Sequence, residues 1–299
     1  LALYSLLYRN IKEKQFILNS VVSVGVIQSV LMIFEWAGLN LFDFFYTGIL
    51  NPGATIVFDE FKPVGTLFNQ MHSASLVSLT IPAMLTRRYY KYIPICIFAI
   101  ILTKTLMAMA TTIGVLLYFI WNKKTDYKFV PIILFLIIGS LMFIFDIDLG
   151  GYLSNTYRHE AWRKTISLIT TNSLFFGHGL GHFAEFFGKI YPVAGQDFNQ
   201  VHNEYLEAFY SLGLFGFSLI SYYIYKLIRK CNDNLLLCGI FAVMINSYGA
   251  FPFHLSSSAF ICLTYFALAK VEGLNVETRE WKGFFGLHGE KSVEPRIFF

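Results

Sequence analysis

Long apolar runs separated by short polar stretches dominate the sequence. A membrane-spanning helix needs about 20 apolar residues, whereas a strand of a membrane barrel alternates apolar and polar positions over about 10 residues. The runs in this chain do not alternate. The pattern therefore predicts an all-α, polytopic membrane helix bundle of about eight spans, two of whose hairpins are short. The runs cover approximately residues 16–39, 65–85, 92–103, 104–121, 129–145, 206–225, 234–249 and 255–269.

Basic residues gather between some of these runs and predict which side of the membrane each loop occupies. Short loops rich in Lys and Arg remain in the cytoplasm. The clusters within 87–91 and 123–128 share that side only if an even number of crossings joins them, so residues 92–121 are predicted to form a short hairpin that turns at residues 102–105. The four clusters are Arg9, Lys12 and Lys14; Arg87, Arg88 and Lys91; Lys123, Lys124 and Lys128; and Lys226, Arg229 and Lys230.

The number of crossings between basic clusters also predicts on which side of the membrane the remaining segments lie. Residues 234–269 are predicted to form a second short hairpin, which turns near Gly249 and Pro252. Two long segments, residues 40–64 and 146–204, are then predicted to lie outside the cytoplasm. The chain begins at Leu1 rather than Met, so we expect a fragment or a trimmed protein. The predicted regions are an N-terminal transmembrane region (1–145), an extracytoplasmic loop (146–204), a C-terminal transmembrane region (205–270) and a cytoplasmic tail (271–299) without a motif, which we expect to lack structure.

Composition supports the membrane assignment. Hydrophobic residues make up 56% of the chain and charged residues only 14%, whereas a soluble domain carries about 25% charged residues. The mean hydropathy is +0.55. The net charge of +4 reflects topology rather than nucleic-acid binding, so no nucleic-acid partner is predicted. The four cysteines lie in or beside apolar runs, which predicts neither a disulfide framework nor a zinc site; they are Cys96, Cys231, Cys238 and Cys262.

The long outer loop contains a segment with helical periodicity. Residues 156–170, TYRHEAWRKTISLIT, place Trp162, Ile166 and Ile169 on one face. This predicts a helix lying at the membrane interface. One interpretation is an anchor, with Trp162 at the level of the lipid headgroups and basic residues on lipid phosphate. The basic residues alongside this face are Arg158, Arg163 and Lys164.

Histidines and glycines follow this helix. In GHGLGHF (177–183), alternate glycines allow the backbone to approach an anion, but no strand precedes them and they are not a dinucleotide fingerprint. The glycines between His178 and His182 also oppose a helix, so a turn is favoured over a metal site. At the loop's end, His202 could accept a proton near pH 7 or could be a structural residue. The chain has no serine-nucleophile, HExxH, P-loop or EF-hand motif.

Four stretches, in the same order and spacing over about residues 60–270, resemble the O-antigen ligase and polymerase superfamily of bacterial membrane glycosyltransferases. GTLFNQMHSASL (65–76) is similar to the family's Gly-Thr-Phe-x-Asn entry to a span. YRHEAWRKTISLITTNSLFFGHGLGHF (157–183) is similar to its Arg-x-x-x-Trp helix and Gly-x-Gly loop. HNEYLEAFYSLGLFGF (202–217) is similar to its His-Asn-x-x-Leu…Gly-Leu-x-Gly signature, and residues 247–268 are similar to its late Phe-Pro-x-His hairpin.

The resemblance implies a metal-independent, inverting transfer of a glycan from an undecaprenyl-diphosphate carrier to a sugar, lipid A-core or protein hydroxyl. It also implies a multi-pass protein of the bacterial cytoplasmic (inner) membrane, with its active site on the extracytoplasmic face, in contact with membrane lipid and without a cofactor. By the resemblance, His202 is the catalytic base and Arg158 holds the diphosphate. The other expected substrate-binding residues are Arg163, Lys104, Asn203 and Glu204.

The chain departs from the family pattern at three positions. Leu106 stands where many members have an arginine, which leaves Lys104 as the nearby cation, while Ser211 replaces an acidic residue and His72 an asparagine. His254 also matches a family position, and we expect it to be structural.

Three alternatives to a ligase remain on sequence grounds. The first is a polymerase of polysaccharide repeat units, which differs in the acceptor. The second is a flippase or transporter, whose ionisable residues would lie inside the spans and whose halves would repeat. The third is an inactive interaction subunit with the same fold.

Overall fold

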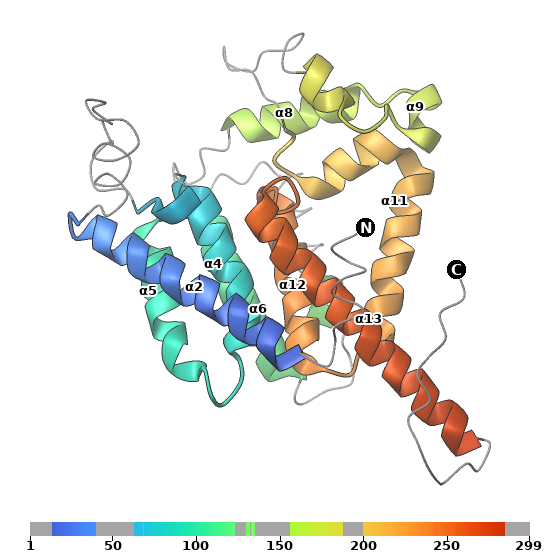
Figure 1. Ribbon diagram of the computed structural model, residues 1–299. Helices are drawn as coiled ribbons and strands as arrows, with labels where there is room; N and C mark the ends of the chain where they lie inside the picture. The colour runs from blue at the N-terminus through green and yellow to red at the C-terminus, as the bar shows by residue number, and fades with distance from the viewer. Residues whose placement is uncertain are drawn as a thin grey trace.

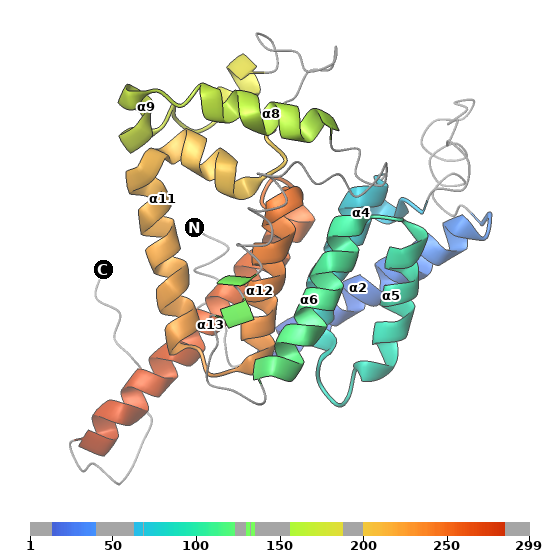
Figure 2. The ribbon, with the colours of Figure 1, turned by 180° about the vertical axis from the view of Figure 1, so that it is seen from behind.

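The computed structural model describes residues 14–39, 63–67, 69–122, 130–131, 133–134, 156–187 and 200–284. In these segments all regular secondary structure is helical, which confirms the predicted all-α class (Figure 1). Helices α8 and α9 lie across one end of an upright bundle (Figures 1 and 2). The elements are α2 (Lys14–Trp36), η3 (Gly65–Leu67), α4 (Gln70–Met84), η4 (Tyr90–Tyr92), α5 (Ile93–Leu102), α6 (Leu106–Asn122), α8 (Thr156–Ser167), α9 (Thr171–Phe176), the π-helical turn η5 (Phe183–Phe187), α11 (Glu204–Lys230), α12 (Asn234–Gly249) and α13 (Ser256–Phe284).

Two of the described helices, α2 and α11, are long and apolar enough to cross a membrane. Shorter apolar helices cover Tyr90–Leu102, Leu106–Trp121 and Asn234–Gly249. The eight predicted spans are therefore only partly matched, and most of the run 129–145 lies outside the described residues. The segment 40–62, most of the expected outer segment 40–64, also lies outside them.

Both predicted hairpins are present. Helices α5 and α6 join through Thr103 to Thr105, where Lys104 adopts a φ of +53° that reverses the chain. Helices α12 and α13 join through residues 250–255, which contain Pro252. Helix α13 then continues to Phe284, so the expectation that the tail lacks structure from residue 271 is wrong up to this point. The physical reason is that no proline or paired glycine interrupts the chain between Pro252 and Phe284.

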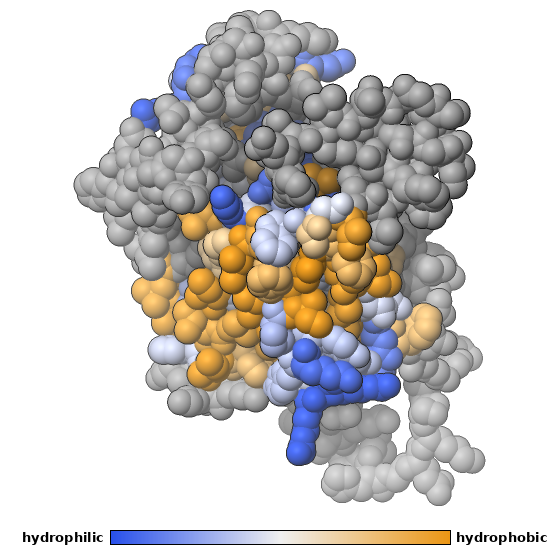
Figure 3. Space-filling view, turned by 90° about the vertical axis from the view of Figure 1, so that its left-hand side faces the viewer, coloured by the Kyte–Doolittle hydropathy of each residue, from blue (hydrophilic) through white to orange (hydrophobic). Residues whose placement is uncertain are grey.

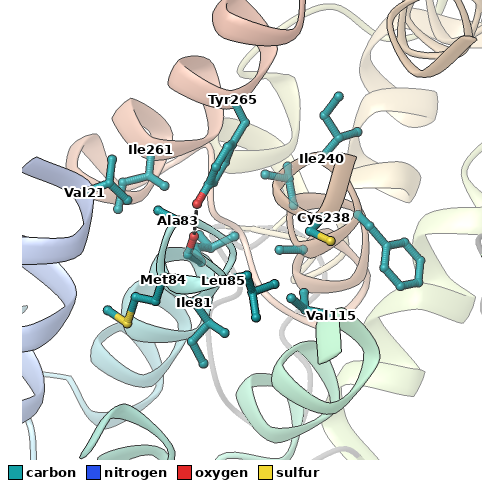
Figure 4. Packing of buried hydrophobic residues seen from close by; sticks show 14 of the residues in the cluster. Val21, Ile81, Ala83, Met84, Leu85, Val115, Cys238, Ile240, Ile261 and Tyr265 are labelled. Carbon is teal, nitrogen blue, oxygen red and sulfur yellow. Dashed lines mark hydrogen bonds between the residues drawn. The ribbon is translucent and has the colours of Figure 1, made fainter. Parts of the chain in front are cut away.

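Helix α12 lies at the centre of the bundle and is buried on nearly all sides. Side chains from α2, α4, α6, α12 and α13 meet around it (Figure 4), and the hydroxyl of Tyr265 donates to the carbonyl of Leu79 over 3.0 Å. Buried polar side chains also form hydrogen bonds between helices in this core. The amide of Asn246 accepts from Ser75 and donates to Ser78 over 3.0 Å. Interhelical hydrogen bonds of this kind tie membrane helices together where water is absent.

The outer surface of the bundle is apolar. Figure 3 shows a hydrophobic belt on the face where α2 and α5 lie, with hydrophilic residues below it. Many large apolar side chains are exposed, among them Ile101, Ile113 and Leu117 on α5 and α6. Exposed apolar side chains on this scale are costly in water and are expected against lipid.

The two ends of the bundle differ in chemistry. At one end Lys14 and Asp233 form an ion pair of 2.5 Å, close to the start of α2 and of α12. The opposite end carries the α5–α6 turn, where Gln70 at the start of α4 donates to the carbonyl of Thr103. Helix α8 lies over part of this second end (Figure 2), which holds the residues considered next.

Candidate functional site

Helix α11 bends sharply at Gly213, which has a φ of +64°. The bend leaves nearby carbonyls without their helical partners, and the glycine-rich loop after α9 supplies replacements. The amides of His178 and Gly179 donate to the carbonyls of Tyr210 and Ser211, both over 2.9 Å. The segment before the bend lies beneath α8, and the segment after it descends along the bundle (Figure 1). The span predicted over 206–225 is therefore bent rather than straight.

Gly177 and Gly213 make this docking possible. A Cβ at Gly213 would lie 2.4 Å from the backbone carbon of Phe175, and one at Gly177 would lie 2.3 Å from the carbonyl oxygen of Ser211. Both distances are far below any real contact, so the backbones meet only because both residues are glycine. The predicted turn between His178 and His182 is present, since Gly179 and Gly181 have positive φ and no helix covers them. The His178 ring stacks on Tyr210 at 4.3 Å, and His182 Nδ1 lies 3.0 Å from the Tyr210 hydroxyl. No group of metal-binding side chains occurs among the described residues.

His202 lies immediately before α11, in the left-handed region at a φ of +57°. Few residues other than glycine adopt this conformation, so the surrounding structure must hold it. The indole Nε1 of Trp162 on α8 donates to the carbonyl of Val201 over 2.7 Å. On the other side the His202 ring packs edge-on against Phe251, with ring centroids 4.8 Å apart. The peptide before His202 and its ring are thus fixed by two elements distant in sequence.

Trp162 therefore has a different role from the anchor considered above. Its side chain is only 6% exposed and also packs against Tyr248 at 5.7 Å. A buried indole needs a partner for its N–H, and Val201 provides one. The interpretation of Trp162 as a residue at the lipid headgroups is wrong, because the face of α8 that carries Ala161, Trp162 and Thr165 is buried inside the protein. Ile166 on the same helix is 45% exposed.

Two glutamates on the first turns of α11 enclose His254 from the α12–α13 loop. Glu204 Oε1 lies 3.4 Å from His254 Nδ1, and Glu207 Oε1 lies 3.1 Å from His254 Nε2. The hydrogen bond to Glu204 and then that to Glu207 raise the pKa of His254 to about 10 against the opposing effect of burial. Both ring nitrogens donate only when the ring is charged, so His254 is an imidazolium at neutral pH.

The same carboxylates also hold the backbone. Glu204 Oε1 accepts from the amide of Phe253 over 3.0 Å, and Glu207 Oε2 accepts from the amide of Val201 over 3.2 Å. We call Glu204, Glu207 and His254 the carboxylate–imidazolium clamp. The clamp joins the residue before His202 to the loop that carries Phe251.

Asn203, which was predicted to bind substrate beside His202, is the N-cap of α11. Its side-chain oxygen accepts from the amide of Leu206 over 3.0 Å, and the residue is 7% exposed. An N-cap of this type stabilises a helix by about 1 kcal/mol.

The predicted cations are distributed over this end of the bundle. Lys104 is exposed on the α5–α6 turn, beside the start of α4. His72 in the first turn of α4 packs against Phe251 at 4.9 Å. The start of α4 and His202 therefore contact the same side chain, that of Phe251. Arg163 is exposed on α8. The backbone of Arg158 lies in the first turn of α8, and its side chain lies outside the described part of the chain.

The comparisons with known proteins bear on this arrangement. Residues 92–221 match the family model described as O-antigen ligase. This stretch carries the O-antigen ligase family domain. The resemblance inferred from the motifs is confirmed, and with it the membrane character of the protein. No curated protein and no solved structure matched the chain.

The O-antigen ligase match runs from η4 through the upper part of α11. It contains Lys104, Arg158, Arg163 and His202 together with both clamp glutamates. It ends before Phe251 and His254, which complete the surroundings of His202 from the α12–α13 loop.

Two features of this candidate site were not predicted from the sequence. No role was predicted for Glu207, and His254 was expected to be structural without a partner being identified. The available signal was the spacing of Glu204 and Glu207, which places both on one face of the first turns of α11. Nothing in the sequence pairs these glutamates with a residue about fifty positions later.

Proposed function

We propose that the protein is an inverting membrane glycosyltransferase of the O-antigen ligase type. It transfers a glycan from an undecaprenyl-diphosphate carrier to a hydroxyl group of a sugar, lipid A-core or protein acceptor. The reaction takes place on the extracytoplasmic face of the bacterial cytoplasmic membrane and uses no metal. The observation that carries the proposal is the positive φ of His202, held between Trp162, Phe251 and the clamp, inside the segment that matches the family.

His202 is the proposed general base. Its Nδ1 atom is buried, so Nε2 is the nitrogen that takes the proton. The acceptor oxygen attacks the anomeric carbon of the donor as its proton passes to His202. The bond between that carbon and the diphosphate oxygen breaks, and the undecaprenyl diphosphate leaves with the bonding electrons. Configuration at the anomeric carbon inverts because attack and departure occur on opposite faces.

Arg158, Arg163 and Lys104 are the proposed partners of the diphosphate. A guanidinium group binds phosphate oxygens through two parallel hydrogen bonds, and positive charge stabilises the leaving group as its bond breaks. Helix α8 carries both arginines, and its Trp162 holds the peptide before His202. One helix thus links the two proposed anion-binding arginines to the base. Asn203 and Glu204 act by positioning, since the former caps α11 and the latter belongs to the clamp.

The decisive experiment is glycan transfer by the purified protein from a lipid-linked glycan to candidate acceptors, with wild type beside His202→Ala. General bases contribute about 100- to 10,000-fold, so the variant should lose transfer by at least about 100-fold while it retains donor binding. His178→Ala is the matched control, because it removes another histidine of the same layer that lies outside the proposed chemistry.

The same assay separates the alternatives. If the donor moves across the vesicle membrane and no new glycosidic bond forms, the protein is a flippase or transporter. Transfer onto another lipid-linked glycan would establish a repeat-unit polymerase. A His202→Ala protein that transfers glycan at the wild-type rate would refute the assignment of the base.

A further inference from the structure

The far end of the bundle carries a groove that the proposed reaction does not use. It lies where α13 passes beside the lower part of α11, as Figures 1 and 2 both show. Its empty volume is about 580 Å³, including the part open to solvent. The residues that line it are Tyr223, Lys226, Leu227 and Lys230 of α11, and Ala269, Lys270 and Gly273 of α13.

Three of these seven lining residues are lysines, and they come from two helices. The rest of the lining is mainly apolar, so the groove combines positive charge with a surface suited to hydrocarbon. Gly273 allows the two helices to approach, since a Cβ there would lie 3.0 Å from the Cβ of Lys230. Lysine residues of both helices therefore line one concave surface.

Asp233, an acidic residue close to this end of the bundle, makes its contacts outside the groove. Asp233 follows α11 by three residues, but its carboxylate pairs with Lys14 at 2.5 Å and caps α12 through the amide of Leu235 at 2.8 Å. No acidic residue lines the groove. The ammonium group of Lys226 also lies 5.3 Å from the centre of the Tyr222 ring.

We propose that the groove between α11 and α13 binds the headgroup of an anionic phospholipid, with Lys226, Lys230 and Lys270 around the phosphate and Leu227 and Ala269 against the start of the acyl chains. Basic pockets between membrane helices recognise anionic headgroups in this way. The groove lies at the end of the bundle where the connection between α4 and α5 carries other basic residues, Arg87, Arg88 and Lys91. This is the end opposite His202, so the lipid is distinct from the glycan donor.

The proposal is tested by thermal unfolding of the purified chain in neutral detergent. Increasing phosphatidylglycerol is added in one series, phosphatidylcholine in a second and inorganic phosphate in a third. Wild type should be stabilised in a saturable manner by phosphatidylglycerol and by neither of the others. A basic residue near a membrane surface contributes about a fivefold gain in affinity, so Lys226→Gln, Lys230→Gln and Lys270→Gln combined should weaken it about a hundredfold.

The matched control is the combination of Arg87→Gln, Arg88→Gln and Lys91→Gln. It removes the same number of charges at the same end of the bundle, outside the groove. It should keep the phosphatidylglycerol effect within about threefold of wild type, since its charges act only at a distance. Equal losses in the two triple variants would refute the groove and leave general attraction between opposite charges.

Other outcomes also decide the matter. Stabilisation of wild type by inorganic phosphate alone would refute a lipid site, because the apolar part of the groove would then contribute nothing. If the groove triple variant is misfolded, Lys226→Gln and Lys270→Gln are measured singly, each with an expected loss of about fivefold. Arg229→Gln is the control for these, since Arg229 contacts the hydroxyl of Tyr225 at 3.2 Å and does not line the groove. Single variants that match Arg229→Gln would overturn the proposal.

Discussion

His202 adopts a backbone conformation that an L-residue with a side chain disfavours. Its φ is +57°, and it lies between Val201 and Asn203, which are both buried. A residue held in this region by its surroundings often marks a functional site. The type of residue at this position was evident from the sequence, but its conformation was not, because histidine does not signal a positive φ as glycine does.

The first prediction uses this conformation to separate chemistry from stability. Glycine adopts a positive φ without strain, so His202→Gly should be more stable than His202→Ala by about 1 kcal/mol. Both should lose glycan transfer by at least about 100-fold. Thermal unfolding in detergent and the transfer assay, run on the same preparations, measure the two quantities. If His202→Gly recovers transfer along with stability, the side chain is only a spacer.

The second prediction concerns His254. Its folded-state pKa of about 10 exceeds the ordinary value of 6.5 because Glu204 and then Glu207 hold the charged ring. A raised pKa stabilises the fold fully below pH 6.5, and this contribution is lost as pH rises toward 10 and beyond. A third of the side chain is exposed, so screening by water reduces the contribution to about 1 to 2 kcal/mol.

The measurement is the difference in unfolding free energy between wild type and His254→Gln from pH 6 to pH 10.5. The difference should shrink as pH rises, while titrations common to both proteins cancel. A difference that stays constant or grows with pH would contradict a charged His254 between the two glutamates.

At the scale of elements, helix boundaries were more predictable than helix shape. The apolar runs located α2, α4, α5, α6 and α12 to within a few residues. Each run predicts its own helix, because a continuous apolar segment must lie against protein or lipid whatever the rest of the chain does. The bend of α11 was missed. A glycine within an apolar run is compatible with a straight helix, and only the docking of the loop around Gly177 requires Gly213 to bend.

The third prediction follows from that docking. Gly213→Ala should destabilise the protein by more than about 3 kcal/mol, because it adds a backbone clash to the strain of a positive φ. Gly179→Ala provides the matched control. Gly179 has a φ of +96°, but a Cβ there meets nothing within 4 Å. It should cost only about 1 kcal/mol of strain. Equal losses in unfolding temperature would show that α9 and α11 do not dock through these glycines.

At the scale of the whole molecule, the features that could not be predicted from the sequence are contacts between segments that lie far apart in the chain. Charge parity predicted both short hairpins correctly, since it depends only on the order of runs and basic clusters. The anchor interpretation of Trp162 was wrong, and the sequence could not exclude it, because an amphipathic helix can turn its aromatic face to lipid or to protein with the same periodicity. The clamp joins residues 204 and 207 to residue 254, and no local pattern encodes that pairing.

The last prediction tests the orientation of the entire bundle. The four cysteines are all buried, so single cysteines introduced at exposed positions will dominate labelling. Leu180 is 82% exposed in the layer of α8 and α9, and Lys104 is exposed on the α5–α6 turn, whereas Arg88 is exposed between α4 and α5 at the other end. Because short basic loops remain in the cytoplasm, Leu180→Cys and Lys104→Cys should react with a membrane-impermeant thiol reagent in intact cells. Arg88→Cys should react only after lysis. Labelling of Arg88→Cys in intact cells, with protection of the other two, would place His202 in the cytoplasm. Equal labelling of Lys104→Cys and Arg88→Cys would show instead that α5 does not cross the membrane.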